Sequence, residues 1–130
     1  MKRLVLSVVC ALFALLTLCA LCETSGDFEY TLSEDGTAVI TSYFGNDTVL
    51  NIPEELDGHS VSGIGDEAFY CCTSLTEVTI PDSVTAIAYD AFYDCPNLIA
   101  TVGRNSYAEQ FCLDNDINYT YVEILDWLND

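Results

Sequence analysis

The chain has 130 residues, of which 51% are hydrophobic, and a formal net charge of −18 at pH 7. This length is enough for one domain and too short for two. With 3 basic residues against 21 acidic ones, nucleic-acid phosphates and anionic membrane surfaces are excluded as partners, because like charges repel. Aromatic and aliphatic residues recur at regular spacing along the chain, so the acidity does not indicate disorder.

Residues 1–22 have the pattern of a secretory signal peptide. Two basic residues precede an apolar run over residues 4–21, after which the sequence becomes polar. Cleavage after Cys22 leaves 21 acidic residues and the single base Arg104, a formal charge of −20. An uncleaved N-terminal membrane anchor is the alternative. A lipid-modified Cys22 or Cys19 fits less well, because leucine precedes each of them. We therefore expect a secreted or cell-surface protein.

Residues 23–47 predict an N-terminal cap built around a β-hairpin at residues 27–43. The turn is Asp35-Gly36, a dipeptide that supplies the positive φ values of a tight turn. We expect the hairpin to cover the first repeat without being a repeat itself. The strand residues that alternate with polar neighbours are Phe28, Tyr30, Leu32, Val39, Thr41 and Tyr43.

Residues 48–103 contain an internal repeat. The segment VSGIGDEAFYCCTSL at residues 61–75 recurs as VTAIAYDAFYDCPNL at residues 84–98, 23 residues later. A fixed period in this range indicates stacked supersecondary units, so the fold class is an α+β repeat, a short solenoid of strands and short helices. The expected structural core is Ile64, Phe69, Cys72, Leu75, Val78, Ile80, Ile87, Phe92, Cys95 and Leu98.

Within one repeat the apolar spacing changes from that of a strand to that of a helix. Val78 and Ile80 alternate as in a strand, which Pro81 ends because proline cannot donate to a further ladder. Ala91, Phe92 and Cys95 then follow the i, i+1, i+4 spacing of a short helix. Leu50 and Ile52 are expected to align with the same strand one repeat earlier.

The first coil carries an insertion. Nine residues separate Ile52 from Val61, against four in the equivalent step of the next coil. The extra residues lie within 54–60, which contain the turn signal Asp57-Gly58 and the histidine His59. Such insertions form loops on one face of a solenoid.

Residues 104–130 predict a C-terminal cap. A further coil begins at residues 98–102, but its spacing slips and places Val102 over Thr79. Ser106 then caps a helix, a strand from Ile117 to Tyr121 follows, and an apolar tail ends the chain. The terminal units of a solenoid have to cover its open core. The helix should bury Ala108, Phe111 and Cys112, and the tail consists of Ile124, Leu125, Trp127 and Leu128.

Four cysteines, Cys71, Cys72, Cys95 and Cys112, follow the signal segment. Cys72 and Cys95 hold the same place in successive repeats, and stacked coils lie about 5 Å apart, so a disulfide between them is possible. Their core spacing also suits free cysteines, which pack as small hydrophobic residues.

The sequence offers little for catalysis or metal binding. His59 with Cys71 or Cys72 is a conceivable base and thiol nucleophile, but no orienting partner is visible. We therefore expect no enzymatic activity and no cofactor. No paired C-x-x-C spacing indicates a metal site. Weak calcium binding is open, although the acidic residues lack the alternating loop of a strong calcium motif. These acidic residues are Asp66, Glu67, Asp90 and Asp94.

Two surfaces are candidates for binding. The outward positions of the strands form one of them, and a tyrosine strip flanked by acidic residues forms the other, since aromatic residues are favoured at interface centres. The tyrosines are equally explained as a wall on the helical side of the coil. The candidate residues are Val49, Asn51, Glu77 and Thr79 on the strands, and Tyr70, Tyr89 and Tyr93 in the strip.

Residues 48–121 resemble the BspA-type leucine-rich repeats. The motifs that carry the resemblance are Ile52-Pro53, Ile64-Gly65-Asp66-Glu67-Ala68-Phe69, Val78-Thr79-Ile80-Pro81 and Ala91-Phe92, with Cys72, Leu75, Cys95 and Leu98. Residues 105–112 are similar to the segment that often closes such arrays.

This resemblance implies a right-handed β-solenoid, a surface or extracellular location, and binding of proteins or matrix. The chain departs from typical members in its short length and in showing no wall-attachment signal after the array. We expect a secreted, monomeric, non-enzymatic module that binds an unknown protein or glycan. The alternative is a structural, capped fragment of a surface array without a ligand of its own.

Overall fold

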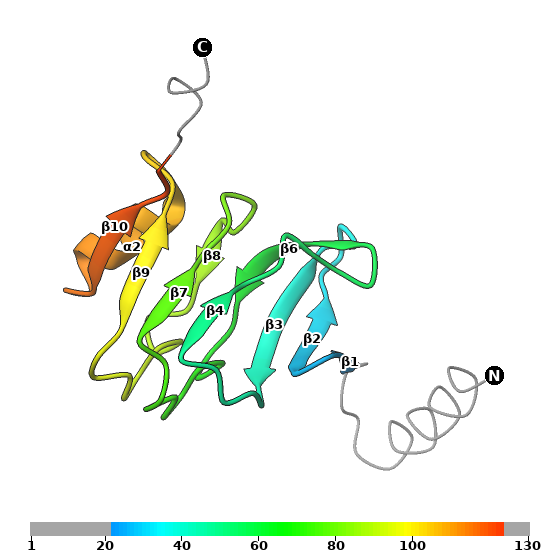
Figure 1. Cartoon of the computed structure of the whole chain (residues 1–130). Helices are drawn as coiled ribbons and strands as arrows, with labels where there is room; N and C mark the ends of the chain where they lie inside the picture. Colours follow the sequence, from blue (N-terminus) through cyan, green and yellow to red (C-terminus); the bar gives the residue numbers. More distant parts are fainter. Residues whose placement is uncertain (1–21, 124–130) are drawn as a thin grey trace.

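The computed structural model describes residues 22–123, which form two β-sheets wound into a solenoid (Figure 1). The predicted solenoid is therefore confirmed. Residues 1–21 of the predicted signal peptide and the predicted apolar tail after Glu123 lie outside the described residues. The described elements are β1 (Glu23–Ser25), β2 (Phe28–Leu32), β3 (Ala38–Tyr43), β4 (Val49–Asn51), β5 (Glu55–Leu56), β6 (His59–Ile64), β7 (Glu77–Thr79), β8 (Ala86–Ile87), β9 (Ile99–Val102), α2 (Tyr107–Asp114) and β10 (Asn118–Tyr121).

One sheet is entirely parallel, with the strand order β10, β9, β7, β4. Each strand comes from a different coil, and the coils are stacked in register. Leu50 lies beside Val78, which lies beside Ala100, and all three are buried. The alternation predicted from Val78 and Ile80 thus places one face of every strand in the core.

The second sheet has the order β1, β2, β3, β6, β5, and β8 also pairs with β6. β3 runs parallel to β6, with Ile40 beside Ile64. The Tyr43 amide donates to the Ala68 carbonyl at 2.9 Å, as the Phe69 amide donates to Ala91 at 2.8 Å. The second strand of the hairpin therefore also occupies the place of a coil, whereas its sequence predicted only a cover.

The predicted short helix of each repeat is a series of turns. The Tyr70 amide donates to Glu67 within its own coil, but the next amide, that of Cys71, donates across to Tyr93 of the following coil. A helix would keep all these bonds within one segment. The left-handed residues Glu67 (φ 54°), Cys71 (φ 56°) and Asp94 (φ 61°) interrupt the helical path and turn alternate amides toward the next coil.

An aromatic spine runs through the core from one cap to the other. Ring centroids are 5.4 Å apart between Tyr43 and Phe69, 4.9 Å between Phe69 and Phe92, and 6.3 Å between Phe92 and Phe111. Phe28 of the first hairpin strand extends this series, 5.2 Å from Tyr43. Phe69 and Phe92, which the sequence repeat aligns, are therefore the centre of a longer stack of rings.

The residues assigned to the core by their spacing lie along this spine. The two cysteines are half-buried and pack against the core, and the other residues are buried. The buried residues are Ile64, Phe69, Leu75, Val78, Ile80, Ile87, Phe92 and Leu98, and the half-buried cysteines are Cys72 and Cys95.

The N-terminal hairpin has an irregularity that its sequence did not indicate. The register between β2 and β3 shifts between Glu29 and Tyr30. Because of this bulge, β3 buries Ala38 and Ile40, while Val39, which the alternation placed with the inward set, is only half-buried. The chain turns at the predicted place, but the tight dipeptide turn is wrong: residues 33–37 connect β2 to β3, and of Asp35-Gly36 only Gly36 has a positive φ, at 82°.

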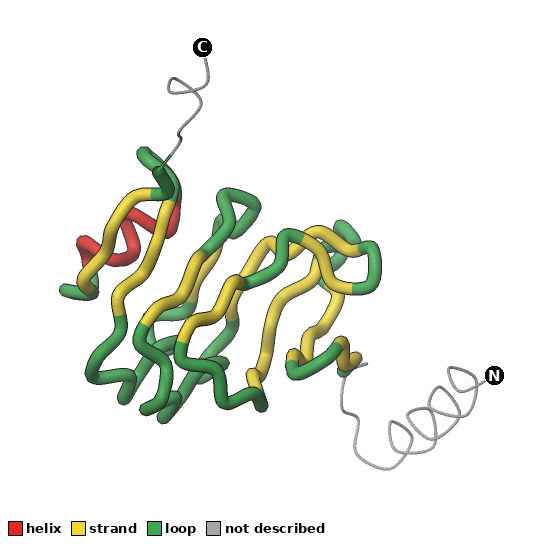
Figure 2. Tube along the Cα trace, viewed as in Figure 1, coloured by secondary structure: helices red, strands yellow, loops and turns green. Residues whose placement is uncertain are grey.

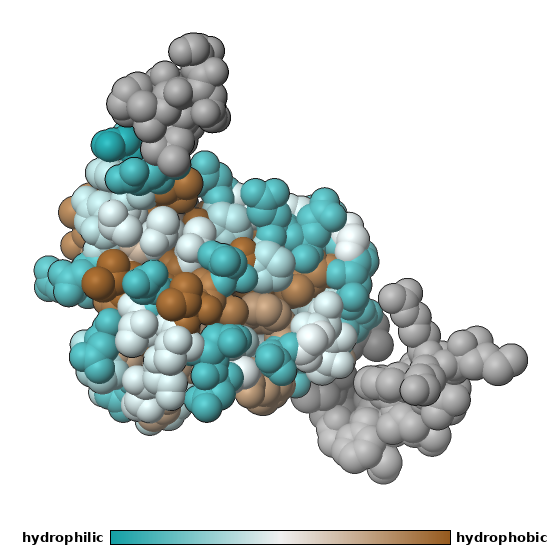
Figure 3. Space-filling view, in the orientation of Figure 1, coloured by the Kyte–Doolittle hydropathy of each residue, from teal (hydrophilic) through white to brown (hydrophobic). Residues whose placement is uncertain are grey.

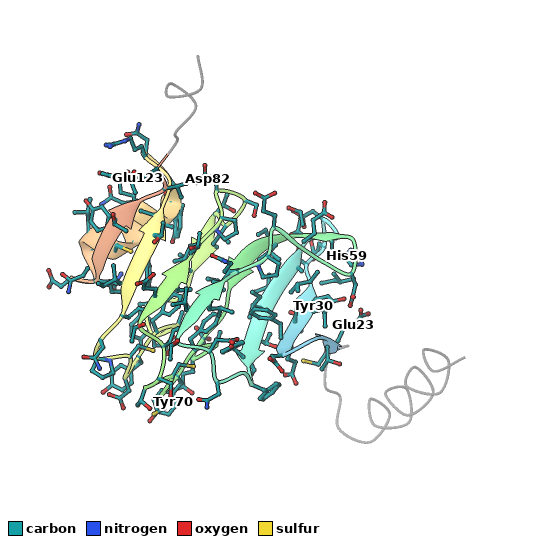
Figure 4. The ribbon with its side chains drawn as sticks, viewed as in Figure 1. Glu23, Tyr30, His59, Tyr70, Asp82 and Glu123 are labelled. Atoms are coloured by element: carbon teal, nitrogen blue, oxygen red, sulfur yellow. The ribbon has the colours of Figure 1, made fainter. Side chains whose placement is uncertain are left out.

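The insertion folds into a second small hairpin, made by β5 and the start of β6. Its turn is the predicted Asp57-Gly58, at φ 51° and 88°. The Tyr30 hydroxyl lies 2.9 Å from both a Glu23 and an Asp57 carboxylate oxygen. His59 Nδ1 lies 3.0 Å from the Gly36 carbonyl oxygen. These contacts hold the insertion against the N-terminal hairpin, where Figure 4 places His59, Tyr30 and Glu23.

At the C-terminal end the step from β7 to β9 is 22 residues, one fewer than the period of 23, and the strands still pair in register. Ala100 pairs with Val78 and Thr101 with Thr79, so Val102 takes the place of Ile80 and not that of Thr79 as the fixed period suggested. Helix α2 follows, with Ser106 as its N-cap accepting a bond from the Glu109 amide. It buries Ala108, Phe111 and Cys112, which covers the last coil, as predicted.

Candidate interaction surfaces

The outer face of the parallel sheet is one candidate surface. Its predicted members all lie on this side: Val49, Asn51 and Glu77 are exposed and Thr79 is half-buried. The register extends them into two rows across the sheet, and Figure 3 shows a band of hydrophobic residues across the viewed face over β4, β7 and β9. One row is Val49, Glu77, Ile99 and Asn118, and the other is Asn51, Thr79, Thr101 and Thr120.

This strand face combines apolar and neutral polar groups. Its second row presents one amide and three hydroxyls at the spacing of parallel strands, about 4.8 Å. Such a ladder can donate to and accept from the hydroxyls of a glycan or the backbone of a peptide. Glu77 is the one acidic residue of the two rows.

The second surface lies along the edge where the loops of successive coils gather, at the lower side of Figure 2. Tyr70 and Tyr93 each follow a spine phenylalanine and point out of the core, 48% and 60% exposed. Their rings stack with centroids 5.9 Å apart and planes within 4° of parallel. Tyr89 is 82% exposed and takes no part in this described stack.

Phe44 extends this arrangement by one coil. It follows the spine residue Tyr43 just as Tyr70 follows Phe69, and it is 66% exposed. Phe44, Tyr70 and Tyr93 together make what we call the outer aromatic row. Three large apolar side chains therefore face solvent next to the spine rings that the core buries.

Acidic groups flank the outer aromatic row. The Cys71 thiol lies 3.8 Å from an Asp94 carboxylate oxygen, and the Glu67 amide donates to Asp90 at 3.4 Å. The hydrogen bond with Cys71, followed by the charges of Cys71, Asp94 and Glu67, raises the pKa of Tyr70. The field here is negative. No cluster of three or more metal-ligating side chains is formed by the described residues.

A pocket of about 200 Å³ opens beside Tyr70. Its walls come from two consecutive coils, residues 43–47 on one side and residues 70–75 on the other. Phe44 and Tyr70 both line it, together with the polar side chains of Asn46, Asp47, Thr73 and Ser74. The Tyr43 hydroxyl donates to Asp47 and so ties the first wall together.

The repeat matches a known family beyond the duplicated segment. Residues 41–128 match the family described as BspA type leucine-rich repeat region, with 6 copies. The chain belongs to the BspA-type leucine-rich repeat family. The match begins within β3, in keeping with the pairing of that strand with β6, and it extends past α2 and β10.

Solved structures of leucine-rich repeat proteins from bacteria have the same fold. A leucine-rich cell surface protein from Faecalibacterium prausnitzii is 34% identical over 80% of this chain and 30% of its own, with a TM-score of 0.62. A leucine-rich repeat protein from T. pallidum is 29% identical over 62% of this chain and 42% of its own, with a TM-score of 0.54. The chain thus spans less than half the length of either protein.

A leucine-rich repeat protein from Bacteroides capillosus is 28% identical over 63% of this chain and 70% of its own, with a TM-score of 0.53. No curated protein sequence matches the chain. Among residues 22–123, no helix has the length and apolar character needed to cross a membrane.

The thiols of this BspA-type chain differ in their surroundings. Cys71 is exposed, Cys72 and Cys95 are half-buried and Cys112 is buried, all as free thiols. The Cys95 thiol lies 3.1 Å from the Phe69 carbonyl oxygen. Burial raises the pKa of Cys72, and it raises those of Cys95 and Cys112 to about 11. These thiols are therefore held protonated in neutral solution.

His59 and Cys71 are not brought together. His59 contacts the Gly36 carbonyl and the ring of Tyr30, at the N-terminal end of the stack. Figure 4 shows it far from Tyr70, the neighbour of Cys71. The base and the thiol considered from sequence thus belong to different regions of the described structure.

Phe44 and its pocket were missed by the sequence analysis. The step from Phe44 to Tyr70 is 26 residues instead of 23, because the insertion adds five residues and the segment from Phe44 to Leu50 is two residues shorter than the one from Tyr70 to Val78. The period alone therefore does not align them. A usable signal was present, because Tyr43-Phe44 is an aromatic pair like Phe69-Tyr70. Only the register of β3 with β6 shows that the pairs are equivalent.

Proposed function

We propose that this protein is an extracellular, non-enzymatic BspA-type module that binds a protein or glycan partner through its exposed faces. The observation that carries the proposal is the outer aromatic row. Its rings stand in solvent beside a pocket, although the core is closed without them. Exposed aromatic groups of this kind are typical of binding sites, since covering them with a partner removes apolar area from water.

The extracellular part of the proposal rests on two further points. The first 22 residues have the pattern of a signal peptide. A relative of 34% identity is named a leucine rich cell surface protein. Mass spectrometry of the product from the culture medium tests this, because a mature chain that begins at Glu23 is expected, and a product that keeps residues 1–22 contradicts it.

A structural role is the second candidate. The chain spans 30% of the Faecalibacterium prausnitzii protein, and its small stack is closed by a hairpin at one end and by α2 at the other. In this role the module would be a capped fragment of a surface array, with no ligand. The aromatic row would then only wall the coil.

A capture experiment separates the two candidates. The purified protein, immobilised, is exposed to extracellular protein and glycan preparations. The double variant Asn51→Ala with Tyr70→Ala changes both surfaces at exposed positions and serves as the matched control. Retention of a partner by the native protein and its loss by the variant support the binding role. Retention of nothing by either protein favours the structural role, and equal retention by both would show that the partner binds outside these two surfaces.

A further inference from the structure

The outer aromatic row contains one filled step and one open step. Tyr93 stacks directly on Tyr70, with centroids 5.9 Å apart. Between Tyr70 and the preceding member, Phe44, lies the pocket of about 200 Å³. The described side chains therefore leave the space between Phe44 and Tyr70 open, with one aromatic ring lining it from each of the two coils.

The charges around this open step are all of one sign. Asp47 lies in the pocket wall, and the charges of Asp94 and Glu67 act on Tyr70. Within residues 22–123 Arg104 is the one lysine or arginine, and it is engaged at the C-terminal cap. The described structure thus offers no internal cation to balance these carboxylates.

The C-terminal cap shows how this chain pairs a cation with a tyrosine. The Arg104 guanidinium carbon lies 4.0 Å from the centroid of the Tyr121 ring. The Tyr121 hydroxyl donates to Glu109 at 2.6 Å, so the ring lies between a cation and a carboxylate. The pocket has two parts of this arrangement, a tyrosine ring and nearby carboxylates, without the cation.

Resting on the proposed binding role, we propose that the pocket between Phe44 and Tyr70 binds an arginine side chain of a basic, extended peptide. A planar guanidinium can stack on the rings and bond to Asp47 or Asp94 with its fork of donors. A lysine ammonium can bond to these carboxylates but stacks less well on the aromatic rings. A neutral sugar can stack but leaves the carboxylates unbalanced.

To test this, a short peptide that repeats Arg-Ser-Gly is titrated into the purified protein, and its affinity is measured by isothermal titration calorimetry at low and at moderate salt. Two peptides of equal length carry lysine or neutral citrulline in place of arginine. The arginine peptide is expected to bind several-fold more tightly than the lysine peptide, and the citrulline peptide is expected not to bind. Equal binding of the arginine and lysine peptides would overturn the stacking role.

Variants locate the site. Phe44→Ala and Tyr70→Ala should each weaken binding of the arginine peptide about three- to tenfold, the range of one cation–π contact. Tyr70→Phe keeps the ring and should bind nearly as well as the native protein. Because these side chains are largely exposed, melting curves should be unchanged, and if Tyr70→Ala does unfold, the Phe44→Ala result decides.

A charge-matched control excludes general attraction to an acidic protein. Glu67→Gln with Asp94→Asn removes two charges at the site, and Glu54→Gln with Glu55→Gln removes two on the insertion hairpin. The first double variant should weaken binding of the arginine peptide at least fivefold more than the second. The reason is that only its two carboxylates lie close enough to the bound guanidinium to form charge pairs. Equal losses would overturn the proposal.

Cys71 provides a footprint, since its exposed thiol lines the pocket. The arginine peptide should slow its alkylation by N-ethylmaleimide, and unchanged labelling would contradict binding there. The outcome also separates the two proposals. If the arginine peptide fails but a glycan or protein is still captured, this inference fails and the binding role stands; if nothing is captured, both fail.

Discussion

Phe92 occupies the middle of the aromatic spine, between Phe69 at 4.9 Å and Phe111 at 6.3 Å. Replacing it with alanine removes buried area and leaves a cavity that the flanking coils cannot fill. We expect Phe92→Ala to lower the free energy of unfolding by about 3–5 kcal/mol. Tyr93→Ala, one residue away and mostly exposed, should change it by about 0.5 kcal/mol or less. Denaturant unfolding of both variants checks this, and similar losses would contradict the spine.

The thiols give a second prediction at the scale of the residue. At pH 8 iodoacetamide should label Cys71 first, Cys72 and Cys95 slowly, and Cys112 only on unfolding, because burial protects the last and raises its pKa to about 11. Peptide mapping by mass spectrometry gives the order. Rapid labelling of Cys112 in the folded protein would contradict the placement of α2.

The same thiols predict a loss of stability in alkali. The folded pKa values of Cys95 and Cys112 are raised to about 11, above the ordinary 9.0, so folding favours the protonated thiol. This contribution is fully present below pH 9 and is lost as the pH rises through about 11. Unfolding free energies measured from pH 8 to 11 should fall. A flat profile would mean that the thiols are accessible.

At the scale of the element, the insertion hairpin and the N-terminal hairpin depend on each other through Tyr30. Its buried hydroxyl lies 2.9 Å from carboxylate oxygens of both Glu23 and Asp57. Tyr30→Phe removes the hydroxyl proton that the two carboxylates share and should cost about 1.5–3 kcal/mol, the range for a hydrogen bond to a charged group. Leu32→Ala, on the exposed part of β2, should have little effect. A thermal melt compares the two.

At the scale of the whole molecule, stability depends on covering both ends of a very short stack. Removing residues 104–130 takes away α2, whose Phe111 packs on Phe92, and β10, which pairs with β9 as far as Val102. We expect a chain of residues 23–103 to lose cooperative unfolding, whereas Phe111→Ala should only lower the melting temperature. A cooperative melt of the truncated chain would show that the repeats are stable without this cap.

Much of this architecture could be predicted because the core repeats in the sequence. The recurrence of Phe69 at Phe92 and of Ile64 at Ile87 indicates the stack, and the motif Asp57-Gly58 indicates its turn. Local spacing was less reliable where another coil supplies the hydrogen bonds. The residues from Ala91 to Cys95 have helical spacing, yet alternate amides of the equivalent segment bond to the neighbouring coil.

The sequence by itself determined the period and the core of this BspA-type chain, because apolar residues must recur wherever stacking buries them, and it predicted the C-terminal helix that covers the last coil. It also indicated Tyr70 and Tyr93, as the neighbours of core positions, as candidates for an exposed strip. Only the tertiary structure decided that β3 serves as a coil, that Val102 takes the place of Ile80, and that Phe44 faces Tyr70 across a pocket. These outcomes depend on the register between strands, and register is set by contacts between residues far apart in the chain.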